Sequence, residues 1–353
     1  MIDLDQIDRE VLDPGGMLDT VEDSGDQWAD AISLSRGLPR DRNARRPAAV
    51  LVGGMGGSGI AGDVAALAAD RSGTMPVVPV KGYELPNWAG ADHLLVAVSY
   101  SGNTEETLSL VEDAGERGCR IAAVTSGGEL AARAVELSWM VARIPGGQQP
   151  RASLPYLAAP TLGILVSSGA LTPGVWDDID ALPDAVRSAA ESWGGRRAVS
   201  LNAAKQAALA LADVVPVFYG GRGVGALVAQ RAKCQINENA GRPAFYSEVP
   251  ERDHNEIVGW ETAAAPLAPV ELRSPADENP RVDARFGAAI DLVGEPVVRQ
   301  LFDGTTWLER FAVGALFVDL VSVYVALLHG TDPTPVEPIE HLKQALAREA
   351  QDA

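Results

Sequence analysis

Cysteine is scarce in this sequence, because Cys119 and Cys234 are the only two among 353 residues. Neither belongs to a CxxC or similar ligand pattern, which argues against a disulfide scaffold and a structural zinc site. The four histidines have no i, i+4 or HxH spacing, so a metal site has little support. We therefore expect a reduced, cytoplasmic compartment and neither a metal nor another cofactor.

Positive charge and long apolar runs are also in short supply. The chain has 29 Lys and Arg against 48 Asp and Glu, a net charge of −19, and such a field repels nucleic acid and anionic membranes. Residues 1–5 are acidic and resemble no secretory signal. The most apolar stretch, 311–328, contains Asp319 and is short for a membrane span, so we expect a buried core helix.

The first half contains apolar runs of four to six residues that alternate with helical patterns. This order is typical of βαβ units whose parallel sheet is buried on both faces. We predict a doubly wound α/β domain with strands at 48–52, 77–80, 94–99, 120–125 and 138–144, and helices at 60–69, 104–117 and 129–134.

The second half repeats this design, since a strand at 214–219 is followed by a glycine turn at 220–225 and an alanine-rich helix. This second turn contains no serine or threonine, whereas the corresponding turn of the first half, 53–59, contains Ser58. Between the halves, periodicity weakens in a stretch rich in Pro, Asp and Gly, where we place the domain junction. The predicted organisation is a helical N-terminal segment at 1–40, a first α/β domain at 41–170, a linker at 171–195 and a second domain with a C-terminal helix at 196–353.

Two loops of the first half are rich in glycine and hydroxyl groups, and each follows a predicted strand. Backbone N–H groups and hydroxyls at the start of the next helix favour a phosphate group. The residues expected to hold it are Gly57, Ser58, Ser99, Ser101 and Thr104. The first loop also matches the GxGxxG dinucleotide fingerprint, but the next strand ends in Lys81 and not in the acidic residue that would bind a ribose.

Four other residues are candidates for the chemistry. Glu238 lies in a helix with mostly small or apolar neighbours, where partial desolvation would raise its pKa and make it a base; the alternative is a solvated surface glutamate. Arg151 follows a strand and a Gly-Gln turn, where ligands collect in α/β sheets, or is an ordinary loop cation. His254 lies in a polar turn and faces either a cleft or solvent. By pattern alone, Lys343 is an exposed lysine on the C-terminal helix.

Together these segments resemble the sugar isomerase (SIS) family, and more closely the bifunctional phosphoglucose/phosphomannose isomerases of archaeal and bacterial type. The resemblance covers nearly the whole chain. The segments that carry it, in order along the chain, are 54–62, 99–107, 150–153, 237–239, 254–257 and 334–336 leading to 342–343.

The resemblance implies two flavodoxin-like SIS domains and a homodimer with shared active sites. It also implies a metal-independent isomerase that interconverts glucose 6-phosphate and/or mannose 6-phosphate with fructose 6-phosphate through a cis-enediol(ate). In that family pattern Glu238 moves the proton between C1 and C2, and Arg151 stabilises the enediolate. His254, from its own or the partner subunit, would assist ring opening, and Lys343 would act near the ring oxygen. The preference between glucose and mannose stays open.

A sugar-phosphate sensor without catalysis is the alternative from another class, because SIS domains also serve as ligand-binding modules. A sensor needs only the second hydroxyl-rich loop, whereas this chain also has Glu238, His254 and Lys343, and no helix-turn-helix segment is apparent. An isomerase of another phosphosugar is the third interpretation.

Overall fold

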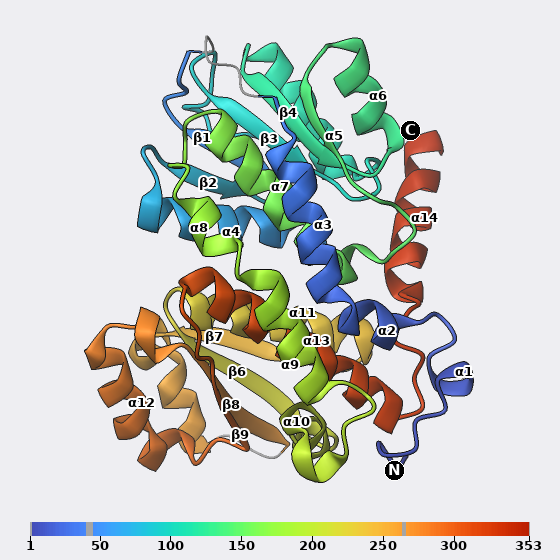
Figure 1. Ribbon diagram of the computed structural model, residues 1–353, viewed down its shortest axis with the longest axis vertical. Helices are drawn as coiled ribbons and strands as arrows, with labels where there is room; N and C mark the ends of the chain where they lie inside the picture. The colour runs from blue at the N-terminus through green and yellow to red at the C-terminus, as the bar shows by residue number, and fades with distance from the viewer. Residues whose placement is uncertain (1, 40–44, 263–265, 353) are drawn as a thin grey trace.

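Two parallel β-sheets lie one above the other along the length of the molecule, each covered by helices (Figure 1). The computed structural model describes residues 2–39, 45–262 and 266–352. The strand order is β2-β1-β3-β4-β5 in the first sheet and β7-β6-β8-β9 in the second. The strands are β1 (Val50–Gly53), β2 (Val77–Val80), β3 (Leu94–Val98), β4 (Arg120–Thr125), β5 (Met140–Arg143), β6 (Val215–Gly221), β7 (Phe245–Val249), β8 (Leu267–Arg273) and β9 (Val298–Leu301). Both orders follow the flavodoxin-like pattern 2-1-3-4-5, the second within its first four positions, which confirms the predicted α/β class.

Alternate residues of the first sheet enter two different cores. On β1, Val50 and Val52 join the core that contains α4 (Gly56–Ser72) and α7 (Leu154–Ser167). Leu51, between them, joins the core formed with α5 (Glu105–Glu116) and α6 (Gly128–Glu136). Since successive side chains of a strand point to opposite faces, helices on both faces require a strand that is apolar throughout.

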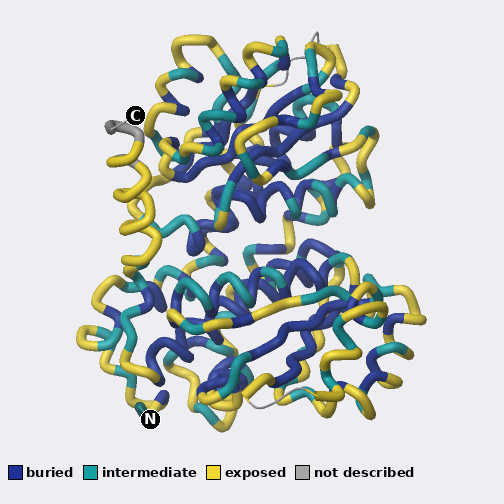
Figure 2. The backbone as a smooth tube through the Cα atoms, turned by 180° about the vertical axis from the view of Figure 1, so that it is seen from behind, coloured by how far each residue is buried: buried dark blue, intermediate teal, exposed yellow. Residues whose placement is uncertain are grey.

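The second sheet is covered in the same way. One face packs against α10 (Ala203–Leu211), α11 (Val224–Asn239) and α13 (Trp307–Leu328), and the other against α12 (Pro280–Val293). Helix α13 includes the stretch predicted as a core helix. It is long and apolar enough to cross a membrane, but 94% of its apolar window is buried inside the structure (Figure 2), which confirms the core interpretation.

The N-terminal segment forms α1 (Arg9–Leu12), α2 (Met17–Glu22) and α3 (Ser24–Arg36). Helix α2 contacts α13 of the second unit, and α3 packs against α7 of the first, so this segment joins the two units. The range 171–195, expected as a linker, contains α8 (Val175–Ile179) and α9 (Leu182–Trp193), and α9 packs against α3 and α13. The domain boundaries stay a prediction.

The remaining elements are short helices and a C-terminal helix. The 3₁₀ helices are η1 (Pro150–Ala152), η2 (Val199–Leu201), η3 (Glu251–His254), η4 (Glu256–Thr262) and η5 (Pro275–Asp277). Helix α14 (Glu337–Asp352) leaves the second unit and runs beside the first (Figure 1), and its surface is largely exposed (Figure 2).

Candidate active site

The first hydroxyl-rich loop joins β1 to α4, at the carboxyl end of the sheet. Helix α4 begins at Gly56, and the side chain of its cap residue, Met55, makes no hydrogen bond to the first turn. The hydroxyl of Ser58 accepts a hydrogen bond of 3.1 Å from the backbone N–H of Tyr100, which ties this loop to the second one. An open helix N-terminus with free N–H groups favours an anion.

The second loop joins β3, the neighbour of β1, to α5. The hydroxyls of Ser99 and Thr104 lie 2.8 Å apart, and Ser99 also accepts from the backbone N–H of Gly102. Ser101 is exposed and accepts from the N–H of Asn103. Thr104 is the cap residue of α5, and its side chain makes no hydrogen bond to the first turn of that helix. The predicted phosphate residues therefore lie on two adjacent loops that a hydrogen bond connects.

Arg151 is buried on η1, with only 2% of its surface exposed, and is not an ordinary loop cation. Its Nε donates to Oδ1 of Asn239, and its Nη2 donates to the carbonyl oxygens of Pro333 and Thr334 at 2.7 and 2.8 Å. Nη1 makes one long bond of 3.3 Å to Gln149. Of the five N–H donors of a guanidinium, one on Nη1 has no acceptor among the described residues. Such a fixed, unused donor can stabilise a developing negative charge.

Glu238 lies beside that donor. It is the penultimate residue of α11, its side chain is 25% exposed, and its Oε2 is 4.0 Å from Nη1 of Arg151. This separation is too long for a hydrogen bond. Burial raises the pKa of Glu238, while the charges of Arg151 and Arg231 oppose the rise. Burial also lowers the pKa of Arg151, but a guanidinium remains charged. The pair therefore combines a carboxylate of increased basicity with a fixed cation.

A small cavity between the two units brings Arg151 and Glu238 together with Gly57 of the first loop, whereas Ser58, Ser99, Ser101 and Thr104 are not among its lining residues. It is lined by Gly56, Gly57, Ile60, Arg151, Gln230, Arg231, Cys234, Gln235 and Glu238. The start of α4 therefore meets η1 and the end of α11. A Cβ atom added to Gly57 would lie 2.8 Å from the backbone nitrogen of Arg151, so only glycine allows the first loop to come this close.

Two family models match the chain. One, described as the SIS domain, matches residues 45–142, and the other, described as the bacterial phospho-glucose isomerase C-terminal SIS domain, matches residues 200–346. A bifunctional phosphoglucose/phosphomannose isomerase of Caldicellulosiruptor bescii is 33% identical over 336 residues, covering 94% of this chain and 99% of that protein. The chain belongs to this isomerase family. The resemblance found in the sequence is thus confirmed.

Another relative and a solved structure are named as enzymes of other sugar phosphates. A D-glucosamine-6-phosphate 4-epimerase of Sulfolobus acidocaldarius is 34% identical over 228 residues, covering 64% of this chain and 67% of that protein. Among solved structures, the C-terminal domain of a glucosamine-fructose-6-phosphate aminotransferase from Francisella tularensis has a TM-score of 0.69 at 16% identity. It covers 90% of this chain and 98% of that chain, and at this identity the similarity shows the fold alone.

Two of the predicted family residues lie apart from the cavity. His254 ends η3 and is exposed, and Lys343 is exposed on α14. Among the described residues, neither His254 nor Lys343 lines the cavity that contains Glu238. Membership of the family does not by itself show that His254 and Lys343 act in the cavity of their own chain. Their roles stay predictions.

The second glycine turn is filled by a side chain of the protein itself. The carboxylate of Glu278 accepts from the backbone N–H of Ser274 and from Arg273, and it is almost fully buried. A Cβ atom added to Gly221 would lie 2.6 Å from its Oε1. This carboxylate occupies the position where the first unit offers its turn to an anion. The expectation that only the first half has an open phosphate cradle agrees with this packing.

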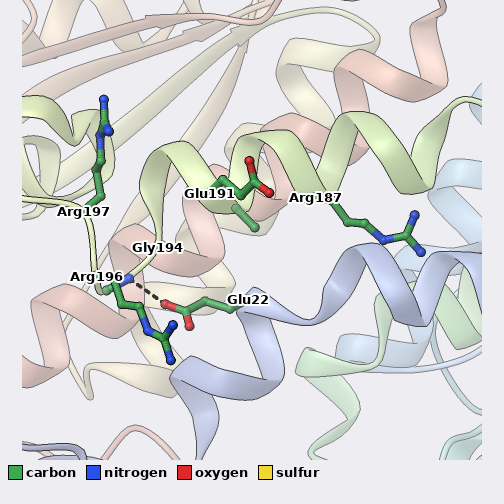
Figure 3. A pocket seen from close by; sticks show the side chains of 8 residues that line it. Glu22, Arg187, Glu191, Gly194, Arg196 and Arg197 are labelled. Carbon is green, nitrogen blue, oxygen red and sulfur yellow. Dashed lines mark hydrogen bonds between the residues drawn. The ribbon is translucent and has the colours of Figure 1, made fainter.

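A larger cavity, of about 420 Å³, lies elsewhere, between α2 and the end of α9 (Figure 3). It contains none of the predicted site residues. Its three arginines, Arg187, Arg196 and Arg197, point in different directions, and the nearby Glu22 accepts a hydrogen bond from the backbone N–H of Gly195. Cations that do not converge make a poor anion site, so size alone does not identify the functional cavity.

The sequence did not single out Asn239, Arg231, Gln235 or Asp319 as functional. These buried side chains surround Arg151 and Glu238 from α11 and α13. One signal for them was present, because Asp319 is the only charged residue in the run 311–328. A carboxylate inside an apolar helix requires a buried partner.

Proposed function

We propose that this protein is an aldose–ketose isomerase that interconverts glucose 6-phosphate and/or mannose 6-phosphate with fructose 6-phosphate. The observation that carries the proposal is the meeting of Glu238, Arg151 and the first glycine loop in one cavity. Isomerisation needs a base beside the acidic C–H and positive charge where the enediolate oxygen forms. Both groups are present within 4.0 Å of each other.

The phosphate group would bind to the two loops that start α4 and α5. The donors are the N–H groups of both first turns and the hydroxyls of Ser58, Ser99, Ser101 and Thr104. Both helix N-termini carry a partial positive charge, which acts at short range and is compatible with the net charge of −19. Binding energy from the phosphate would then hold the reacting carbons beside Glu238.

In the chemical step, Glu238 removes the proton from C2 of the aldose and returns it to C1, while the hydroxyl proton of O2 passes to O1. The reverse reaction starts with the removal of a proton from C1. The enediolate oxygen would accept the unused N–H of Arg151. The charge of this arginine is held in place by Asn239 and by two carbonyl oxygens, so little reorganisation is needed when the negative charge develops.

Ring opening precedes this step and needs groups near the ring oxygen. We assign it to His254 and Lys343 of a homodimer, because both are exposed and lie outside the cavity of their own chain. Helix α14, which bears Lys343, has exposed apolar side chains at Ile339, Leu342 and Leu346. These lie three or four residues apart, a spacing that places them on one helix face, which a second copy would cover.

The experiment is a coupled assay of the purified protein with glucose 6-phosphate and with mannose 6-phosphate in millimolar EDTA. Turnover with either sugar supports the proposal, and Glu238→Gln is the matched control for a contaminating isomerase. No turnover with either sugar, together with tight binding of both, would favour the sensor. In a third experiment the protein is incubated with glucosamine 6-phosphate and the sugar is monitored by NMR, because one relative is named as an epimerase of that sugar. A change at C4 alone would replace the proposal.

A further inference from the structure

A buried ion pair lies directly behind the candidate site. Asp319, in the middle of the apolar helix α13, accepts from Nε and Nη2 of Arg231 at 2.8 and 2.6 Å. The amide of Gln235 donates to the same carboxylate at 2.7 Å. All three side chains are buried. Burial raises the pKa of Asp319, while the charge of Arg231 and the hydrogen bonds from Arg231 and Gln235 oppose the rise. The two-point contact with a guanidinium is the geometry of a charge-assisted pair.

The same pair is connected to the groups of the site. Nη2 of Arg231 also donates to the backbone carbonyl of Arg151 at 2.8 Å. Asn239, which accepts from Nε of Arg151, donates to the hydroxyl of Ser322, one turn of α13 beyond Asp319. Helix α13 therefore supports η1 through two routes, and both depend on polar residues within its apolar stretch, 311–328.

Arg231 also lines the cavity with Glu238, so its charge acts on that carboxylate. The groups that act on Glu238 are Arg151 from η1 and Arg231 and Lys233 from α11, with the thiol of Cys234 beside it. Lys81 acts on Cys234, and Asp332 acts on Arg151. Of the cations, only Arg231 has its charge compensated by a bidentate buried carboxylate.

We propose that Asp319 is a positioning residue that neutralises and orients Arg231, so that Glu238 remains basic enough to remove the substrate proton. The inference rests on the proposed isomerase function. Without the carboxylate, Arg231 would present an uncompensated cation to the cavity and could pair with Glu238 directly. The base would then be weaker, and Arg151 would lose part of its support.

The test is the pH dependence of kcat/KM, whose acid limb reports the base of the free enzyme. Asp319→Asn keeps the shape of the side chain, and we expect the acid limb to move to lower pH by about 0.5 to 1 unit. The double variant Arg231→Gln, Asp319→Asn removes both charges, and its acid limb should return to within about 0.3 unit of the wild type. A structural role alone would not restore the limb in this way.

Asp277→Asn is the matched control, because Asp277 forms a similar buried pair with Arg310 in the first turn of α13, outside the cavity. It should lower stability and leave the acid limb in place. If Asp319→Asn does not fold, the same measurement is made on Arg231→Gln. We expect the acid limb of its kcat/KM profile to move to higher pH. If Asp319→Asn folds and its acid limb stays within about 0.2 pH unit of the wild type, the inference is wrong. Absence of turnover in the wild type would instead refute the isomerase function itself.

Discussion

Replacing Gly57 by alanine should damage catalysis by moving Arg151, although the added methyl group would touch no substrate atom. The new Cβ would lie 2.8 Å from the backbone nitrogen of Arg151, 2.9 Å from the carbonyl carbon of Pro150 and 3.0 Å from the Cα of Arg151. All three are backbone atoms, so no side-chain rotation relieves the overlap. Comfortable contacts between such atoms are about 3.5 Å or more, so η1 and α4 must separate by roughly 0.7 Å.

The size of the effect follows from this displacement. Overpacking of this kind costs about 1 to 3 kcal/mol of stability. A misplacement of about 1 Å in a site can lower the rate about 100-fold, so this somewhat smaller shift should lower kcat about tenfold. The KM for the sugar phosphate should rise less, because the hydroxyls of the second loop do not move with η1.

The assay is the coupled isomerase reaction, combined with thermal unfolding of the same samples. Gly82→Ala is the matched control, since a Cβ at Gly82 would meet nothing within 4 Å. We expect this control to keep wild-type kcat and Tm. A Gly57→Ala protein that folds and retains kcat within about twofold of wild type would refute the reasoning, because the loop and η1 would then not be in the contact described.

Four further predictions concern single residues. Glu238→Gln should lower kcat by about 100- to 10,000-fold with little change in KM, measured by steady-state kinetics, because a general base acts mainly in the transition state. Ser101→Ala should weaken substrate binding, seen by calorimetry, because it removes a hydroxyl from the phosphate loop. Glu278→Ala should lower Tm, and millimolar sulfate should recover part of the loss, because the emptied turn and Arg273 remain. Asp277→Asn should lower Tm at neutral pH. Burial alone would raise the pKa of Asp277, but Arg310 and other donors lower it overall, so its stabilisation is lost as the pH falls through the folded value, and the difference in Tm should shrink below about pH 4.

The fold could be predicted largely from apolar patterning. The predicted strands at 77–80 and 120–125 coincide with β2 and β4, and the helix at 104–117 differs from α5 by one residue at each end. The pattern was less informative at 171–195, where Pro, Asp and Gly indicated an irregular connection. That range forms α9, whose apolar face packs against α3 and α13. Tertiary packing, which local composition does not report, decides its structure.

Single residues of the candidate site could be predicted from the sequence, but the hydrogen bonds that link them could not. Glu238 and Arg151 were both identified from the sequence, and the structure places them 4.0 Å apart. The hydrogen bonds from Arg151 to Pro333 and Thr334 link residues more than 180 positions apart, which no spacing rule describes. His254 and Lys343 are both exposed and do not line the cavity with Glu238, so their roles stay predictions.

The arrangement of α4 and α11 explains why two similar units can form one asymmetric site. The start of α4 and the end of α11 share the cavity that contains Glu238, whereas Leu67 of α4 and Gly223 at the start of α11 share another cavity, so the two helices run antiparallel. A helix N-terminus stabilises an anion, and a C-terminus destabilises one. The first favours the substrate phosphate, and the second lies beside Glu238, whose pKa is raised by burial. Glu278 fills the turn at the start of α11, and the opposite end of that helix carries Glu238, the proposed base.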